Sequence, residues 1–299
     1  MNDKYMGMLS CAIRSSVLAG KRILDVYETE FNIELKDDSS PVTLADRFSH
    51  KIIFDLFTAE YPHIPILSEE GRAVSFEERN GWKQFWLVDP LDGTKDFIKK
   101  NGEFTVNIAL VEKNRPVLGV VYIPFSDTMY LGIDGRGAFK LDRARDCIQK
   151  AERTEKKIPD LVLDRSSSLP LINEKPRSRF VIVKSRSHSG EETECCIKRL
   201  VQLYKESEVI AAGSATKLCI LAEGSADVYP RFGPTMEWDT AAGHAILRNS
   251  GGGLFRTDNW SPLVYNKEDL RNPSFVAVGS STEEMNKLLK SICTEGAES

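Results

Sequence analysis

The sequence predicts an α/β protein, with an antiparallel sheet and two long helices in the N-terminal half and a mixed sheet with helices in the C-terminal half. Near the N-terminus, apolar residues recur at helical spacing, which is the pattern of amphipathic helices. Short β-branched and aromatic segments follow one another over residues 104–141, as in an antiparallel meander. In the second half, strand-like and helix-like segments alternate, which is typical of layered α/β proteins.

The N-terminal half begins with the two predicted helices. Thr43 is a suitable N-cap for the second, and Asp46 falls in its first turn, where an acidic residue commonly serves only the helix dipole. The expected core face of this helix carries Leu44, Phe48, Ile52 and Leu56. The predicted elements are helices over residues 5–27 and 43–60, and strands over residues 64–67, 85–88, 104–111, 117–123, 128–133 and 137–141.

The C-terminal half is predicted as a second domain. Residues 142–178 are rich in charge and Ser with weak periodicity, so we expect a mobile connection there. This gives an α+β domain over residues 1–150 and an α/β domain over residues 178–299. The predicted elements are strands over residues 180–183, 208–211, 226–229, 252–256 and 275–278, and helices over residues 191–204, 214–223, 240–249 and 283–293.

Composition restricts the class of protein. The 299 residues carry a formal net charge of −4, which argues against a nucleic-acid polymer as partner, because that affinity needs excess Lys and Arg. The six cysteines include no CxxC pair and the four histidines include no zinc-type spacing, so free thiols in a reducing cytoplasm are expected. The first residues lack the pattern of a signal peptide and no apolar run is long enough to span a bilayer, so we expect a protein without a transmembrane segment.

The stretch after the predicted strand over residues 85–88 is the first candidate for chemistry. Asp89 and Asp92 flank Pro90 and Leu91, and Gly93 with Thr94 then allows a sharp turn. Two carboxylates held this close repel each other unless a cation lies between them, and Mg²⁺ prefers such oxygen ligands, a backbone carbonyl included. The alternative is an ordinary Asp-Pro, Asp-Gly turn.

Two further acidic positions could join this corner. Glu69 ends the predicted strand over residues 64–67, and it becomes relevant if the strand over residues 85–88 lies alongside; otherwise it is solvated surface. Asp239 lies at the start of a predicted helix whose first residues are small, so a ligand could approach closely. Its alternative role is that of a helix cap.

Phosphate-binding residues are predicted in the second half. Gly213 and Ser214 open a predicted helix, whose free N–H groups and the Lys217 ammonium could hold a phosphate. Arg231 lies on a stiff loop after a strand and suits a second phosphate or stacking on a base. A capped helix with an exposed Lys, and a surface ion pair, are the alternatives.

Jointly, these motifs resemble one family. Ser68-Glu69-Glu70, Asp89-Pro90-Leu91-Asp92-Gly93-Thr94 and Trp238-Asp239-Thr240-Ala241-Ala242 resemble the inositol monophosphatase superfamily of Mg²⁺-dependent, Li⁺-sensitive phosphatases, which implies a layered fold of the sugar-phosphatase type. The longer strings resemble its bacterial 3′(2′),5′-bisphosphate nucleotidases of the CysQ type. These strings are Asn101-Gly102-Glu103-Phe104-Thr105-Val106-Asn107-Ile108-Ala109-Leu110, Tyr229-Pro230-Arg231-Phe232-Gly233-Pro234-Thr235, Ser39-Pro41-Val42-Thr43 with Asp46, and Ser185-Arg186-Ser187-His188.

The resemblance implies a centre of two or three Mg²⁺ ions. Glu69, Asp89 and the Leu91 carbonyl would hold the first ion, Asp89, Asp92 and Asp239 the second, and a third would be reached by Glu69 through water. Such ions polarise phosphoryl oxygens, activate water and shield a leaving alkoxide. The resemblance also makes Thr94 and Asp46 the pair that orients and deprotonates the water.

The implied substrate is a small bisphosphate nucleotide. Adenosine 3′,5′-bisphosphate would be cleaved to AMP and phosphate, and 3′-phosphoadenylyl sulfate is a related substrate. Inositol phosphate or another sugar phosphate is an alternative within the superfamily, and a non-catalytic metal or nucleotide sensor is an alternative of another class. The residues implied to bind substrate are Gly93, Thr94, His188, Gly213, Ser214, Lys217, Arg231 and Asp239.

Overall fold

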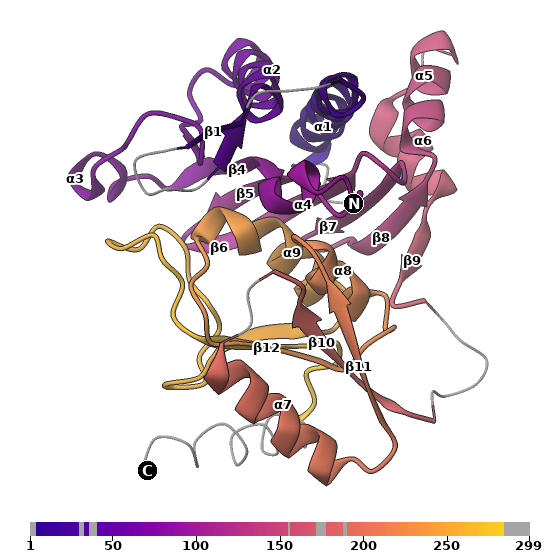
Figure 1. Cartoon of the computed structure of the whole chain (residues 1–299). Coiled ribbons are helices and arrows are strands. Elements are labelled where there is room, and N and C mark those ends of the chain that lie inside the picture. The colour runs from indigo at the N-terminus through magenta and orange to yellow at the C-terminus, as the bar shows by residue number, and fades with distance from the viewer. Residues whose placement is uncertain are drawn as a thin grey trace.

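The computed structural model describes residues 4–29, 33–35, 41–154, 156–171, 178–187 and 190–283. Its main elements stack in five layers (Figure 1). From one side to the other, the layers are helices α1 (Met6–Tyr27) and α2 (Leu44–Glu60), a seven-stranded sheet, helices α9 (Glu237–Asn249) and α8 (Thr216–Ala222), a five-stranded sheet, and helix α7 (Glu191–Leu203). The predicted layered α/β fold is therefore confirmed. The predicted helix over residues 283–293 lies almost wholly outside the described residues.

The seven-stranded sheet has the strand order β3-β4-β5-β6-β7-β8-β9. Strands β3 and β4 are parallel, whereas every later pair is antiparallel, as the meander pattern predicts. The strands are β3 (Ile66–Ser68), β4 (Gln84–Asp92), β5 (Thr105–Glu112), β6 (Arg115–Ile123), β7 (Thr128–Ile133), β8 (Gly137–Asp142) and β9 (Ser167–Leu169). A separate antiparallel pair, β1 (Ile33–Leu35) and β2 (Pro41–Thr43), precedes α2.

Helix α2 packs on the sheet through a face one residue away from the predicted one. Ile53 and Phe57 are buried, and the Phe57 ring stacks on Trp86 of β4 with ring centroids 4.2 Å apart. Leu44 is exposed, whereas the other residues of the predicted face are only half-buried at its edge. The predicted core face is therefore displaced by one residue. The buried face carries the small residues Ala45 and Ser49, which allow the helix backbone to approach β4 closely.

The predicted mobile connection over residues 142–178 is wrong where the structure describes it. Residues 144–154 and 158–165 form helices α5 (Ala144–Thr154) and α6 (Ile158–Arg165), and β9 then adds the last strand of the larger sheet. Cys147, Ile148 and Leu161 are buried in the same core as α1. In α5 the buried residues Ala144, Cys147, Ile148 and Ala151 recur at helical spacing, but the residues between them are charged or polar, so the segment as a whole has a polar composition. The domain boundaries drawn from this stretch stay a prediction.

Helix α9 lies unusually close to the larger sheet. A Cβ atom at Gly119 of β6 would collide with the carbonyl oxygen of Ala242, and one at Gly132 of β7 would be 2.5 Å from the backbone of Ile246. Only glycine allows this approach, because any side chain would force the helix away from the strands. Helix α9, which lies late in the chain, is thereby fixed to the seven-stranded sheet, which the first half of the chain builds.

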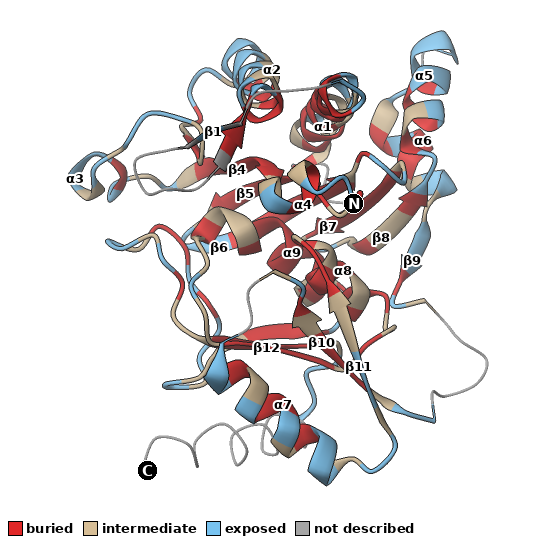
Figure 2. Cartoon of the chain, in the orientation of Figure 1, coloured by how far each residue is buried: buried red, intermediate tan, exposed pale blue. Residues whose placement is uncertain are grey.

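The five-stranded sheet has the order β11-β10-β12-β14-β13 and is mixed, as predicted. Burial follows the layers, since the strands and the inward faces of the helices are buried (Figure 2). No helix in the described ranges is long and apolar enough to cross a membrane. The remaining elements are strands β10 (Phe180–Ser185), β11 (Ser207–Ala212), β12 (Val228–Arg231), β13 (Gly253–Arg256) and β14 (Phe275–Val278), and helices α3 (Phe76–Arg79) and α4 (Thr94–Ile98).

The buried His244 of α9 makes stability sensitive to acid. Its Nδ1 lies 2.9 Å from the Tyr265 hydroxyl, and burial lowers the pKa of the imidazole to about 4. Because the unfolded chain takes up this proton near pH 6.5, folding stability should fall between about pH 6.5 and pH 4, by about 3 kcal/mol. Denaturant unfolding of the wild type and of His244→Gln at both ends of this range measures the difference. An equal pH dependence in the two proteins would contradict the prediction.

Candidate active site

A cavity of about 650 Å³ opens between the larger sheet, α9 and the smaller sheet. This volume is in the usual range for small-molecule sites. Of the predicted site residues, Asp46 lies behind Thr94 rather than in the lining, and His188 lies outside the described residues. The other predicted residues all line the cavity, namely Glu69, Asp89, Leu91, Asp92, Gly93, Thr94, Gly213, Ser214, Lys217, Arg231 and Asp239.

The Asp89 corner is an interruption within β4 rather than its end. Strand β4 pairs with β5 up to Asp89, loses register across Pro90, and pairs again at Asp92. Proline has no N–H to donate to the ladder, so the strand bends there instead of continuing regularly. The buried Ser49 hydroxyl of α2 donates to the Pro90 carbonyl oxygen at 2.6 Å, and the Leu91 N–H donates to Asp89 Oδ1 at 3.1 Å. These bonds fix the corner against α2.

Glu69 reaches the same edge because β3 and β4 are parallel. Ser68 pairs with Val88, and the Glu69 N–H donates to the Val88 carbonyl oxygen at 3.1 Å. Glu69, just after the end of β3, therefore lies beside the Asp89 corner of β4, which was the condition for Glu69 to be more than solvated surface.

Asp92 is oriented by residues of β5. Asn107 Nδ2 donates to Asp92 Oδ2 at 3.2 Å, and the Thr105 hydroxyl donates to Asn107 Oδ1 at 2.8 Å. Thr105 and Asn107 are buried. One side of the Asp92 carboxylate is thus held by the neighbouring strand.

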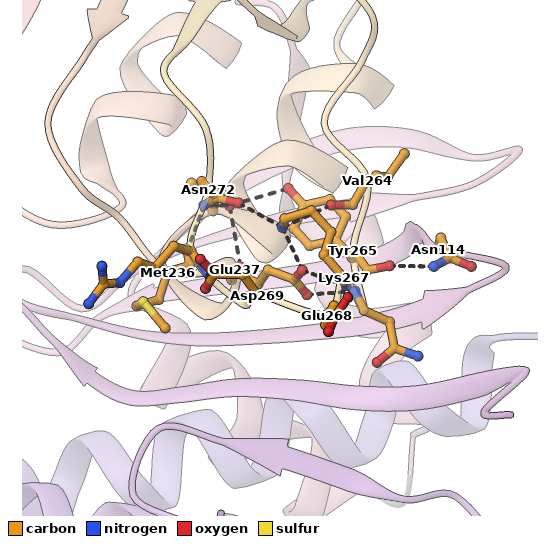
Figure 3. A network of polar contacts seen from close by, with 12 residues as sticks. Asn114, Met236, Glu237, Val264, Tyr265, Lys267, Glu268, Asp269 and Asn272 are labelled. Atoms are coloured by element: carbon orange, nitrogen blue, oxygen red, sulfur yellow. Dashed lines mark hydrogen bonds and ion pairs between the residues drawn. The ribbon is translucent and has the colours of Figure 1, made fainter. Parts of the chain in front are cut away.

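Asp239 is held by the first turn of α9. The Met236 N–H donates to Asp239 Oδ2 at 2.8 Å, so the carboxylate caps its own helix as well as lining the cavity. The helix start is in turn braced by a loop (Figure 3). Asn272 Nδ2 donates to the Met236 carbonyl oxygen at 2.8 Å and to the Thr240 hydroxyl at 3.0 Å.

A buried ion pair completes this brace. The Glu237 carboxylate accepts the N–H groups of Asn266 and Lys267 at 2.6 and 3.0 Å, and the Lys267 ammonium lies 2.5 Å from Glu237 Oε1 (Figure 3). Glu237 has no exposed surface. Such a carboxylate is tolerated only with these partners, so the loop over residues 266–272 and the start of α9 form one unit.

The electrostatics of the cavity favour a bound cation. Burial, together with the charge of Glu69 and Asp92, raises the pKa of the Asp89 carboxyl well above its usual range. Burial and the charge of Asp92 do the same to the pKa of Asp239. These shifts mean that the negative charges are not balanced by the protein, and an all-oxygen set of this kind suits a hard divalent ion.

The carboxylates that line the cavity do not form a complete metal-binding group. Across the described part of the chain, no three His, Cys, Asp or Glu side chains form a group that could hold a metal ion as they stand. The predicted triple of Asp89, Asp92 and Asp239 shares the cavity without converging. Mutual repulsion of like charges in a buried site keeps such side chains apart.

Thr94 and Asp46 meet as predicted. The Thr94 hydroxyl donates to Asp46 Oδ1 at 3.1 Å, while the N–H and hydroxyl of Thr43 both donate to Asp46 Oδ2 at 2.7 Å. Burial raises the pKa of the Asp46 carboxyl, although the Thr43 bonds oppose the shift. Asp46 is therefore both a capping residue of α2 and the partner of a hydroxyl that lines the cavity.

The Gly213–Lys217 segment differs in part from its prediction. Helix α8 begins at Thr216, and Ser214 lies in a turn before it with a φ of 45°. The Lys217 ammonium donates to the Ser214 carbonyl oxygen, and burial lowers the pKa of this ammonium to about 8. Lys217 is 8% exposed, so the alternative of a freely exposed Lys is wrong.

Arg231 and several unpredicted residues complete the polar lining. Arg231 is buried and its Nη2 donates to the Pro234 carbonyl oxygen at 2.9 Å. The polar residues missed from the sequence are Lys95, Asp96, Ser185, Ser187, Tyr229, Thr235 and Thr240. Each of them lies inside a motif noted above or within two residues of one, so proximity in sequence was the available signal.

Comparisons with known proteins identify the family of the chain. The sequence profile of the inositol monophosphatase family matches residues 5–295. A 3′(2′),5′-bisphosphate nucleotidase CysQ from Shigella flexneri is 41% identical over 262 residues, covering 86% of this chain and 94% of the relative. CysQ of Escherichia coli K12 is 40% identical over the same shares.

Solved structures give the same result. The crystal structure of CysQ from Bacteroides thetaiotaomicron, described as a bacterial member of the inositol monophosphatase family, superposes with a TM-score of 0.82 at 41% identity. The match covers 94% of this chain and 100% of that chain. An inositol monophosphatase from Thermotoga maritima shares the fold with a TM-score of 0.71 at 19% identity. The chain therefore belongs to the inositol monophosphatase family, whose members are metal-dependent phosphatases.

Proposed function

We propose that this chain is a 3′(2′),5′-bisphosphate nucleotidase that uses water to split adenosine 3′,5′-bisphosphate into AMP and phosphate. The observation that carries the proposal is that one cavity holds groups of both charges. Carboxylates at the end of β3, in β4 and in α9 line it together with the buried cations Lys217 and Arg231. The first set suits metal ions and the second suits an additional phosphate. The CysQ relatives, which match most of this chain, are named for this activity.

The ions are proposed to be Mg²⁺, two or three in number. Glu69, Asp89 and the Leu91 carbonyl would hold one, and Asp89, Asp92 and Asp239 another, with a third reached by Glu69 through water. Such ions, when bound, polarise the phosphoryl oxygens and make water a stronger nucleophile. Bound cations would offset the mutual repulsion of these carboxylates, which contributes to the raised pKa values of Asp89 and Asp239.

The remaining chemistry falls to neighbouring residues. The Thr94 hydroxyl would orient the attacking water, and the water's proton would pass through Thr94 Oγ1 toward Asp46 Oδ1. The N–H groups of Gly93 and Thr94 would bind the reacting phosphate. Gly213, Ser214, Lys217, Arg231 and His188 would hold the rest of the nucleotide. The described cysteines are free thiols, which fits a cytoplasmic enzyme.

Phosphate release from a small panel of substrates tests the proposal. With Mg²⁺ present, adenosine 3′,5′-bisphosphate is expected to have the highest kcat/KM, ahead of its 2′ isomer, 3′-phosphoadenylyl sulfate and inositol 1-phosphate. A preference for inositol 1-phosphate would replace the nucleotidase by a sugar phosphatase. Absence of turnover on every compound would favour a sensor.

Lys217→Met should raise KM for the bisphosphate nucleotide by about tenfold to a hundredfold, because a hydrogen-bonded charge on an anionic ligand contributes about 1.5–3 kcal/mol. KM for inositol 1-phosphate should change far less. Lys184→Met, which removes a half-exposed ammonium paired with Glu194 at 3.1 Å, is the matched control and should change neither. Equal effects of Lys217→Met on both substrates would contradict the role in nucleotide binding.

A further inference from the structure

Glu103 joins the two sheets at the rim of the cavity, and neither the reaction nor the metal site uses it. It precedes β5 of the larger sheet, between Gly102 and the buried Phe104. Its own N–H donates to Asn101 Oδ1 at 2.9 Å, which fixes its backbone. Its side chain therefore leaves a defined position toward the smaller sheet.

The carboxylate of Glu103 accepts three hydrogen bonds from that sheet. Arg186 Nε and Nη2 donate to Oε2 and Oε1 at 2.7 and 2.6 Å, a bidentate pair, and the Gly213 N–H donates to Oε2 at 2.7 Å. Arg186 also donates to the Ala211 carbonyl oxygen at 2.9 Å. Arg186 follows β10 and Gly213 follows β11, so one side chain holds the ends of both strands.

The contact requires glycine at position 213. A Cβ atom there would lie 2.9 Å from Asp96 Oδ2 and 2.9 Å from Glu103 Oε2, closer than real Cβ atoms come. The same turn also faces the Gly93 turn, since a Cβ at Gly93 would be 3.3 Å from Ser214 Cβ and 2.9 Å from the Glu103 carbonyl oxygen. Glu103 thus sets how far the Gly213–Ser214 turn lies from the Gly93–Thr94 turn.

We propose that Glu103 is a positioning residue for substrate specificity, which places the Gly213–Ser214 turn and, through it, the Lys217 ammonium for the part of a bisphosphate nucleotide outside the reacting phosphate. The inference rests on the proposed nucleotidase function. Lys217 donates to the Ser214 carbonyl oxygen, so a displaced turn also displaces the cation. The carboxylates of Asp89 and Asp239 are held by the N–H groups of Leu91 and Met236, which lie outside this turn, so binding of the reacting phosphate should be affected less.

The ion pair itself contributes little to stability. The Glu103 and Arg186 side chains are 30% and 44% exposed, and pairs this exposed typically contribute no more than about 1 kcal/mol. Variants at this position should therefore fold. The Lys184–Glu194 pair, 34% and 38% exposed and also attached to β10, is a matched control that does not line the cavity.

Steady-state kinetics of Glu103→Ala, Glu103→Gln and the control Glu194→Ala test the role. Glu103→Ala should raise KM for adenosine 3′,5′-bisphosphate about tenfold with kcat nearly unchanged, whereas KM for inositol 1-phosphate should change far less. Glu103→Gln keeps an acceptor for the Gly213 N–H and should recover part of the loss. Glu194→Ala should match the wild type. Equal increases in KM for the two substrates, or none, would overturn the inference.

Hydrogen–deuterium exchange provides a measurement that needs no substrate. The amide of Gly213 should exchange about tenfold faster in Glu103→Ala than in the wild type or Glu194→Ala, because its acceptor is gone. Unchanged exchange would overturn the positioning role. Failure of the wild type to hydrolyse adenosine 3′,5′-bisphosphate would instead refute the proposed function, and the exchange result would still decide the part concerning Glu103.

Discussion

Asp89→Asn is expected to lower kcat/KM by roughly a thousandfold or more while the protein stays folded. Asp89 is 1% exposed and would bridge two ions, and a metal ion supplies several kcal/mol of transition-state stabilisation. The amide keeps the size of the side chain and an oxygen for the Leu91 N–H. The substitution therefore removes charge and little packing.

Thermal unfolding with and without Mg²⁺ separates this charge effect from damage to the fold. Because burial and neighbouring carboxylates raise the pKa of Asp89, its ionised form destabilises the metal-free protein at neutral pH. Metal-free Asp89→Asn should melt at or above the wild-type Tm, and added Mg²⁺ should raise its Tm less than that of the wild type.

Asp134→Asn is the control for loss of a carboxylate. Asp134 pairs with Arg115 at 3.0 Å and also with Arg248, and it does not line the cavity. This variant should keep its activity and its response to Mg²⁺. Near-normal turnover by Asp89→Asn, with a normal shift in Tm on adding Mg²⁺, would rule out the proposed bridging ligand.

Thr94→Val is expected to lower kcat by about a hundredfold to ten-thousandfold, the usual contribution of a positioned general base, with little change in KM. Valine keeps the shape of threonine but cannot relay a proton to Asp46. Asp46 retains both bonds from Thr43, so the start of α2 should not be disturbed.

Single-turnover rates and far-UV circular dichroism of Thr94→Val and Thr94→Ser test this role. Serine restores the hydroxyl and should recover most of the rate. If Thr94→Val turned over at the wild-type rate, or if Thr94→Ser were as slow as Thr94→Val, the hydroxyl would not be the group that handles the proton.

Local chemistry explains which parts of the fold were readable in the sequence. Thr43 and Asp46 make the capping interactions that their residue types predict, and the meander follows alternating β-branched segments with short turns. Helices α5 and α6 were missed because charged residues surround the buried ones, such as Ile148 and Leu161, so the polar composition of the segment concealed the apolar face.

The sequence predicted which residue types form the site but not how they are arranged. Asp89, Asp92 and Gly93 lie within one short stretch, so their corner could be predicted. That Glu69 shares an edge with Asp89 depends on the parallel pairing of β3 and β4, which no short motif encodes. The contribution of Glu103 depends on contacts with residues far along the chain.

The close seating of α9 on Gly119 and Gly132 means that this enzyme cannot be divided into two autonomous pieces. A fragment ending before residue 172 would leave a glycine-lined apolar surface in water and would lack Asp239 altogether. Split versions expressed together should regain phosphatase activity only upon reassembly, and then in proportion to the fraction reassembled. The glycines that let one helix approach the strands thus make catalysis depend on both parts of the chain.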